Sequence, residues 1–294
     1  MGDSKGHITN GTAFCILAIW HFFNLLKLQQ VQSKSNSRTS LPVWFPSSPI
    51  RYLELLFIMV ASSISFYMEV FTGSHHHGPL AADGSFLSEH IPHLEHAVFA
   101  LAIFVYAFAA LLLDKIPNPS NHAFTNSLAA VAFAVELFTF HLHSTDHIGL
   151  EGRYHWLFQI VIFTTLATTL LGIGSGESFV IGYLRSISLL FQGVWLINTG
   201  FMLWTPWLIP KGCFMNKEKK NGHSAVRCHT VEALNRAKGL ATLQFSYCAL
   251  IIVSLTLATY LVFVKARGLN GQDQSSAEGC DEVDAEQKCR LVGQ

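Results

Sequence analysis

Charged residues are scarce in this chain of 294 residues. Asp, Glu, Lys and Arg together make up 13% of the sequence, about half of the roughly 25% that is typical of soluble domains. Half of the residues are hydrophobic. A soluble surface of this size needs more charge than this, so the composition argues against a soluble domain and favours a protein embedded in lipid.

Several other features are absent. The 19 Lys and Arg residues are balanced by 19 Asp and Glu residues, so we expect no nucleic-acid partner. Six cysteines are too few and too scattered for a disulfide framework. The chain has neither the Gly-x-Ser-x-Gly motif of serine hydrolases nor the Gly-x-x-x-x-Gly-Lys-Ser/Thr loop that binds nucleotide phosphates. The apolar runs are therefore the main source of information.

Seven apolar runs are long enough to cross a membrane, because a spanning helix needs about 20 mostly apolar residues. They are predicted at 8–28, 52–71, 91–113, 121–141, 156–173, 179–204 and 239–264. The predicted fold is all-α, a polytopic membrane protein with a seven-transmembrane-helix bundle in residues 1–264. The remaining residues, 265–294, are polar and are predicted to form a disordered tail.

Seven spans would place the two ends of the chain on opposite sides of the membrane. Lys and Arg residues near the span ends do not decide the orientation, because loop 206–238 is basic as well. Cys213 and Cys228 both lie in that loop and can form a disulfide if it faces an oxidising compartment. We therefore prefer a cytosolic C-terminus, and the pairing of these two cysteines is left open.

The histidines gather at one membrane face. Counting alternate span ends places thirteen of the fifteen histidines on the side of the N-terminus, here called face B. Only His21 and His122 fall near the opposite side, face A. Face A also carries Glu54 and Arg185, which could pair with each other. This one-sided distribution is the main functional signal in the sequence.

Six side chains near face B form a candidate metal site. Glu136 lies about two turns inside the fourth span, where an ionisable group costs energy and normally faces a partner in the bundle. Neutral imidazoles with a carboxylate are a common ligand set for zinc and also suit iron, copper or nickel. The predicted ligands are His93, His96, Glu136, His141, His143 and His155. The alternative is that each histidine is solvated separately at the membrane interface.

Four motifs resemble one known family. They are Gly6-His7 with Gly11 and Phe14, His90-x-x-His93-x-x-His96, Glu136 followed by Phe140-His141-Leu142-His143, and Leu190-Phe191-Gln192-Gly193-Val194-Trp195. Over about residues 6–264 the chain resembles the TMEM45 family, also known as DUF716, and most closely a plant branch described as viral-response or stress-related. The resemblance implies a seven-span protein of the plasma membrane or the secretory pathway, such as the Golgi or other endomembranes. It implies no activity.

Three functions stay open at this point. A divalent metal ion such as zinc at face B would be structural, or catalytic in a hydrolase of lipid-like substrates. In a proton-linked transporter or channel, Glu136, Glu69 and the histidines would relay protons, although face A offers few polar groups to complete the path. The third function is that of a non-enzymatic membrane adaptor in a stress or defence response. The expected partner is the lipid bilayer; a homo-oligomer is compatible with the sequence, and protein partners are unknown.

Overall fold

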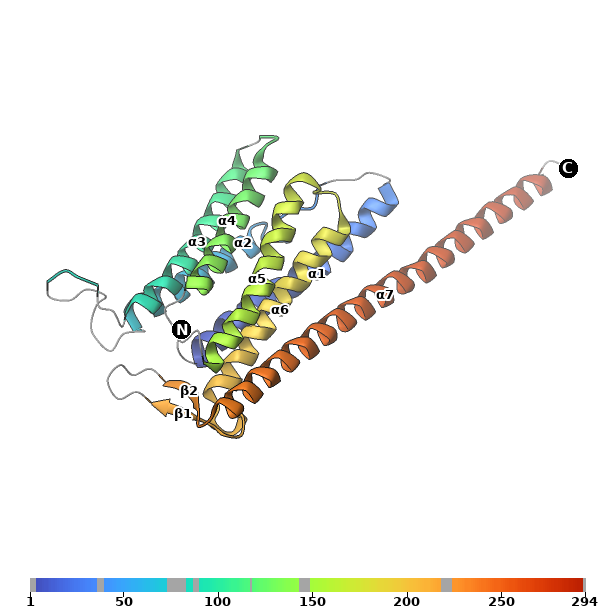
Figure 1. The fold of residues 1–294 in the computed structure, drawn as a ribbon. Coiled ribbons are helices and arrows are strands. Elements are labelled where there is room, and N and C mark those ends of the chain that lie inside the picture. Colours follow the sequence, from blue (N-terminus) through green and yellow to red (C-terminus); the bar gives the residue numbers. More distant parts are fainter. Residues whose placement is uncertain are drawn as a thin grey trace. The chain divides into compact units, whose positions relative to one another are not determined.

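The computed structural model describes residues 4–35, 40–72, 83–86, 90–116, 118–142, 149–217 and 224–292, and these are mostly helical (Figure 1). Within these residues, seven helices are long and apolar enough to cross a membrane. They are α1 (Ser4–Ser35), α2 (Leu53–Tyr67) with its π-helical continuation η1 (Met68–Thr72), α3 (Ile91–Lys115), α4 (Asn121–Leu142), α5 (Leu150–Gly174), α6 (Phe179–Trp204) and α7 (Val231–Val292). The predicted all-α fold with seven spans is confirmed.

The chain divides into two compact units, Met1–Leu250 and Ile251–Gln294. The first unit contains α1 to α6 and the first part of α7. In the second unit α7 continues as a helix to Val292, where the composition predicted a disordered tail from residue 265. No proline follows Pro210 in the sequence, and extending an existing helix avoids the unfavourable nucleation step.

Three helices begin earlier than the apolar runs predicted, among them α1, which begins at Ser4. α5 begins at Leu150 and α7 at Val231, each several residues before its apolar run. Charged residues end a hydropathy signal, but they do not end a helix that has left the hydrocarbon core. Arg153, for example, lies in the first turns of α5 and donates a hydrogen bond of 2.8 Å to Thr242 on α7.

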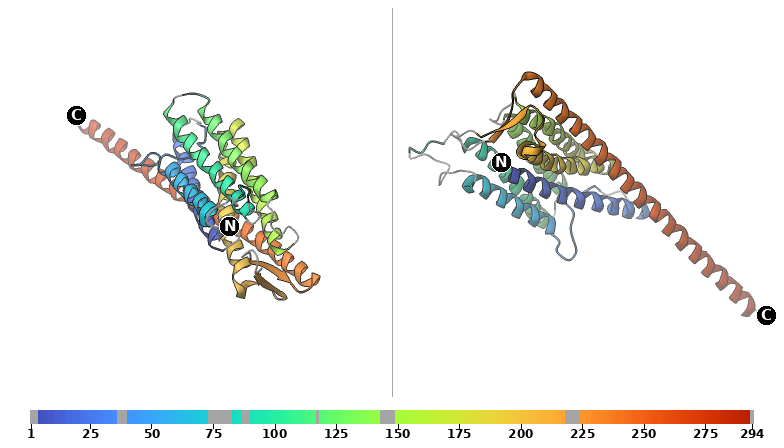
Figure 2. Two further views of the ribbon diagram at one scale, coloured as in Figure 1. Left: turned by 90° about the vertical axis from the view of Figure 1, so that its left-hand side faces the viewer. Right: turned by 90° about the horizontal axis from the view of Figure 1, so that it is seen from below.

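In the first unit, neighbouring helices pack in the order α2, α3, α4, α5, α6 and α1 (Figure 2). The most extensive contact is between α1 and α6, whereas α1 and α2 scarcely touch each other. Gly11 on α1 and Gly193 on α6 allow the close approach of their two helices, as small residues commonly do in membranes. The N-terminal helix is therefore an integral part of the bundle.

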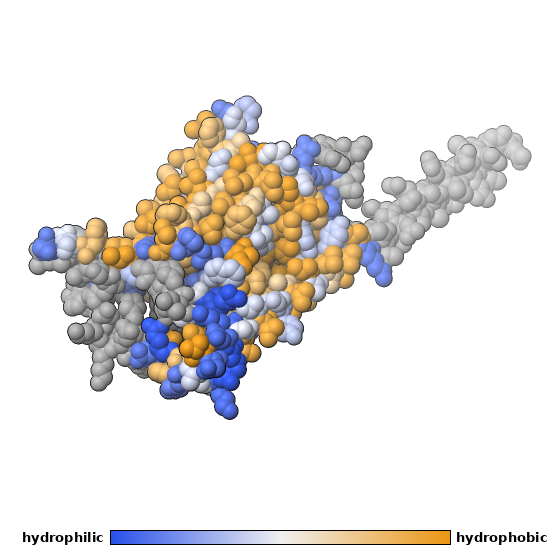
Figure 3. Space-filling model, in the orientation of Figure 1, coloured by the Kyte–Doolittle hydropathy of each residue, from blue (hydrophilic) through white to orange (hydrophobic). Residues whose placement is uncertain are grey.

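Large apolar side chains cover the outside of the helices. In the view of Figure 3 they cover most of the bundle, and hydrophilic residues gather at the end that carries the β-hairpin. Phe124, Phe138 and Phe163, for example, lie within the spans α4 and α5 and have exposed side chains. A surface of this kind is stable only when lipid covers it, which agrees with the seven spans.

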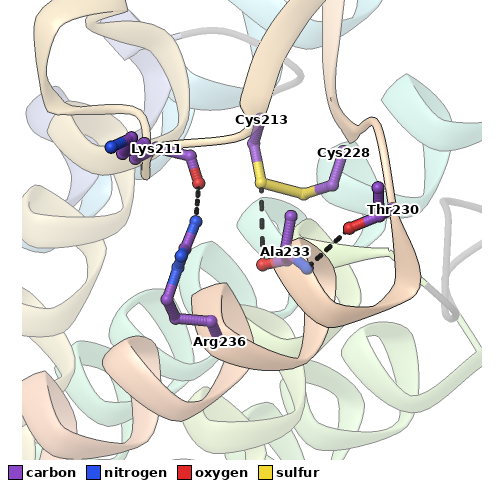
Figure 4. Close-up of a disulfide and its surroundings, with 6 residues drawn as sticks. All are labelled: Lys211, Cys213, Cys228, Thr230, Ala233 and Arg236. Atoms are coloured by element: carbon purple, nitrogen blue, oxygen red, sulfur yellow. Dashed lines mark hydrogen bonds between the residues drawn. A yellow bond between two sulfur atoms is a disulfide. The ribbon is translucent and has the colours of Figure 1, made fainter.

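A short β-hairpin lies between α6 and α7, where the sequence analysis predicted only a loop. Strand β1 (Cys213–Lys217) pairs antiparallel with β2 (Ser224–Cys228). Cys213 lies opposite Cys228, and a disulfide joins them (Figure 4). Thr230 caps the start of α7 by accepting a hydrogen bond from the Ala233 amide, and Arg236 donates to the Lys211 carbonyl (Figure 4). The hairpin lies at the same end of the bundle as the start of α1, which is face B (Figure 1).

Candidate functional site

His93 forms a buried pair with Glu69 at face B. His93 lies in the first turn of α3, and Glu69 lies in the π-helical turn η1 at the end of α2. The distance between His93 Nδ1 and Glu69 Oε2 is 2.8 Å, and both side chains are largely buried. π-Helical turns are frequent at functional sites. Glu69 was not among the predicted ligands, although its span end had already placed it at face B.

Three buried histidines from three helices lie in a row of ring contacts that includes Phe140. The ring centroid of Phe140 is 5.9 Å from that of His96 on α3 and 5.5 Å from that of His155 on α5. His155 stacks on His7 of α1, with 6.1 Å between the ring centroids and 3° between the ring planes. His7 was missed as a site residue, although its assignment to face B was the available signal.

Glu136 lies one helical turn from Phe140, on the buried face of α4. Its side chain is fully buried. Among the residues that the structure describes, neither carboxylate oxygen of Glu136 has a hydrogen-bond partner. A carboxylate in this position is costly if it is ionised and unpaired.

His141 points away from this group. Its side chain is exposed, and its Nδ1 lies 3.0 Å from Gln159 Oε1 on α5. Each helical residue turns the side-chain direction by about 100°, so His141 does not share the buried face with Phe140. His143 lies outside the described residues.

The predicted ligands are therefore brought together only in part. His96 and His155 contact the same phenyl ring, Glu136 lies one turn away, and His93 is bound to Glu69. In the described part of the chain, no group of three or more His, Cys, Asp or Glu side chains is arranged to hold a metal ion.

A polar network lies between α5 and α6. Gln192 Nε2 donates to Thr165 Oγ1 at 2.6 Å, and Thr165 Oγ1 donates to Ser188 Oγ at 3.0 Å. Gln192 is fully buried, and its Oε1 atom has no partner within the described residues. The contact between Gln192 on α6 and Thr165 on α5 joins the two helices, as polar side chains commonly do in membranes.

Glu54 forms the centre of a second polar cluster, at face A. Its Oε2 atom accepts hydrogen bonds of 2.8 Å from Trp20 Nε1 and from the backbone N–H of Phe45. Its Oε1 atom lies 2.8 Å from His21 Nε2. The sequence left a pair between Glu54 and Arg185 open; in the structure, Arg185 Nη2 donates to the carbonyl of Pro42 at 2.9 Å.

These contacts hold a loop segment, residues 41–45, against the face A end of the bundle. The Leu41, Val43, Trp44 and Phe45 side chains are buried. The Leu41 carbonyl lies 2.8 Å from His122 Nε2. The two face A histidines, His21 and His122, thus both help to hold the segment.

A comparison with known protein families finds a match in the middle and later parts of the chain. Residues 122–261 match the model of DUF716, a family of unknown function. This match confirms the resemblance to DUF716. The DUF716 region runs from α4 into α7 and contains Glu136, Phe140, His155 and Gln192, whereas the His93–Glu69 pair precedes it.

Proposed function

We propose that this protein conducts protons across the membrane through the interior of its helical bundle, with Glu136 as the central proton-binding group. The observation that carries the proposal is the complete burial of Glu136 without a hydrogen-bond partner in the described residues. A carboxylate in this environment binds a proton readily, because the neutral form avoids the desolvation cost of the charge. A proton, unlike a metal ion, also needs no set of converging ligands.

The buried histidines supply a route between Glu136 and face B. His96 and His155 flank Phe140, one turn from Glu136. An imidazole can accept a proton on one ring nitrogen while it releases a proton from the other, so histidines commonly serve as proton shuttles. His7, stacked on His155, extends the imidazole series to α1.

The polar network between α5 and α6 supports a continuation beyond Glu136. His141 on α4 contacts Gln159 on α5. Because these two consecutive spans run in opposite directions, moving back along α4 from His141 to Glu136 corresponds to moving forward along α5 from Gln159 to about Thr165. Glu136 and Thr165 therefore lie at about the same depth. Thr165, Ser188 and Gln192 therefore lie deep in the bundle. The sequence analysis found few polar groups towards face A, and the Glu54–His21 pair adds a titratable group there.

The 41–45 segment packs against the helices at the face A end, and a proton path to face A would have to pass it. We therefore favour a gated transporter over an open channel. The Cys213–Cys228 disulfide at face B supports an orientation with face B towards an oxidising space, either the lumen of the secretory pathway or the cell exterior.

A flux measurement in liposomes tests the proposal. The purified protein is reconstituted with the pH-sensitive dye pyranine inside the vesicles, and a pH gradient is imposed while valinomycin and potassium clamp the membrane potential. The wild type should dissipate the gradient faster than protein-free vesicles, and Glu136→Gln should reduce the rate to that of the protein-free vesicles. Glu177→Gln, which makes the same chemical change at an exposed turn, should behave as the wild type.

Two results would overturn the proposal. A wild-type rate equal to that of empty vesicles would exclude proton conduction under a pH gradient. A Glu136→Gln rate equal to the wild-type rate would exclude Glu136 as the central group. Size-exclusion profiles of the three proteins establish that the comparison is made between folded proteins.

A metal ion at the face B histidines stays a second prediction from the sequence. The contacts of His96 and His155 with Phe140, and of His7 with His155, favour it, because imidazole is the commonest protein ligand for metal ions. The described residues contain no group of three or more such side chains arranged to hold an ion, so side chains would have to rearrange to bind one.

A further inference from the structure

A groove between α1, α2 and α3 contains a cavity of about 70 Å³. It occurs where α1 and α2 scarcely touch each other. By the same measure one water molecule needs about 10–15 Å³, so the cavity accommodates several carbon atoms of a hydrocarbon chain. Its lining side chains are mostly apolar or small: Asn10, Ala13, Phe14, Leu17, Phe57, Ile58, Ala61, Ser62, Ser65, Phe99, Ala100 and Ile103.

The cavity leads towards polar groups at face B. On each of the three helices, a titratable side chain follows the lining about one turn closer to face B. On α1 it is His7, three residues from Asn10; on α2 and η1 it is Glu69, four residues from Ser65. On α3, His96 is followed by His93, which is bound to Glu69.

We infer that this groove binds one acyl chain of a phospholipid from the leaflet at face B, with the lipid headgroup next to the His93–Glu69 pair. All three walls belong to membrane spans, so the surrounding medium is hydrocarbon. A gap between helices in this medium is filled by lipid, because an empty gap loses dispersion contacts along its lining. The pair at the headgroup level gives the lipid a fixed polar end.

A second groove provides a comparison. It lies between α3 and α4, and it is lined by Ala109, Leu112, Leu113, Phe124, Ser127, Leu128 and Val131. As in the first groove, the lining itself contains no histidine or carboxylate. Asp114, which follows Leu113, pairs with Arg51 outside these two helices, so among the described residues no ion pair like His93–Glu69 joins the two walls of this groove. We expect this groove to hold lipid only as any apolar surface does, whereas the groove between α1, α2 and α3 holds one lipid in a defined position. The inference does not depend on proton conduction.

Photo-crosslinking tests the inference. The full-length protein is reconstituted in phosphatidylcholine vesicles that contain an increasing fraction of phosphatidylcholine with a diazirine in one acyl chain. After illumination, crosslinked peptides are quantified by mass spectrometry. Labelling of the groove between α1, α2 and α3 should saturate at a low probe fraction. Labelling of the groove between α3 and α4 should rise in proportion to the probe.

Two matched variants sharpen the test. Ala61→Trp fills the first groove and should abolish its saturable labelling, whereas Ala109→Trp fills the second groove and should leave it unchanged. Both alanines are half-buried groove residues. If Ala61→Trp fails to fold, His93→Ala decides, because it keeps the groove and removes half of the polar pair. The labelling should then lose its saturation.

Three outcomes would overturn the inference. One is proportional labelling in both grooves, which would identify ordinary surrounding lipid. The others are saturable labelling that survives in folded Ala61→Trp, and saturable labelling that is unchanged in His93→Ala. The liposome flux of the wild type is measured separately, so either proposal can fail while the other stands.

Discussion

The backbones of Gly11 and Gly193 are in direct contact. A Cβ atom on Gly11 would lie 2.7 Å from the carbonyl oxygen of Gly193, and a Cβ atom on Gly193 would lie 2.6 Å from that of Gly11. Both glycines belong to the motifs that resemble DUF716. Their contact draws α1 onto α6, and it thereby positions His7 next to His155.

Gly193→Ala should therefore destabilise the protein by about 1–3 kcal/mol, as overpacking does in well-packed interiors. Thermal unfolding in detergent, followed by tryptophan fluorescence, measures the change. Gly239→Ala is the control, because a Cβ atom there would meet no described atom within 4 Å. A glycine-to-alanine change in such a helical position should be neutral or stabilising by about 0.5–1 kcal/mol. Equal stability of the two variants would contradict the close contact.

Glu54→Ala should destabilise the protein by about 3–5 kcal/mol, which is typical when one partner of a buried pair is removed. The change leaves the N–H groups of Trp20 and Phe45 without their acceptor, and it removes the partner of His21. Thermal unfolding measures the loss. With Val43→Cys as a reporter, alkylation should also be faster in the Glu54→Ala protein than in the protein that keeps Glu54, since the 41–45 segment is released.

Asp114→Ala is the matched carboxylate control for this prediction. Asp114 pairs with Arg51 at 3.0 Å, but the Arg51 side chain is 59% exposed. Exposed ion pairs contribute about 0–1 kcal/mol, so the loss should be small. Comparable losses in the two variants would mean that Glu54 does not hold the 41–45 segment.

Cys213 and Cys228 should react with alkylating reagents only after reduction, because a disulfide joins them. Peptide mass spectrometry of native membranes, alkylated with and without reductant, measures this. Replacing both cysteines by serine should cost about 3 kcal/mol, as expected for a loop of 15 residues. Cys15→Ser serves as a control, since Cys15 is a free thiol. Alkylation without reductant would argue against an oxidising environment at face B.

The predicted metal site has its own test. If the face B histidines hold a divalent ion, metal analysis of the purified protein should find about one ion per chain, as expected for a single site. His96→Ala with His155→Ala should release the ion and lower the melting temperature, because binding to the folded state adds to stability. Acidification below the unperturbed imidazole pKa of about 6.5 should release it too. His141→Ala should have no effect, since that side chain is exposed; unchanged metal in the double variant would exclude the site.

The seven spans could be predicted because they depend on local composition. An apolar run of about 20 residues satisfies its backbone hydrogen bonds as a helix wherever it lies in the bundle. Counting alternate span ends then placed His93, His96 and His155 on one face. Neither step needs knowledge of which helices are neighbours.

The partners of the polar residues depended on the tertiary structure. One residue along a helix turns the side chain by about 100°, so the rotation of each helix decides that Glu136 is buried and His141 exposed. The order of the helices decides that Glu54 meets His21, and that His7 joins the site from the other end of the sequence. The β-hairpin that brings Cys213 to Cys228 likewise depends on the pairing of two segments.

The sequence by itself determined which residues cross the membrane and near which face they lie, because burial in lipid depends on each segment alone. Only the packing of the helices decided which of these residues touch, because contacts depend on several segments at once.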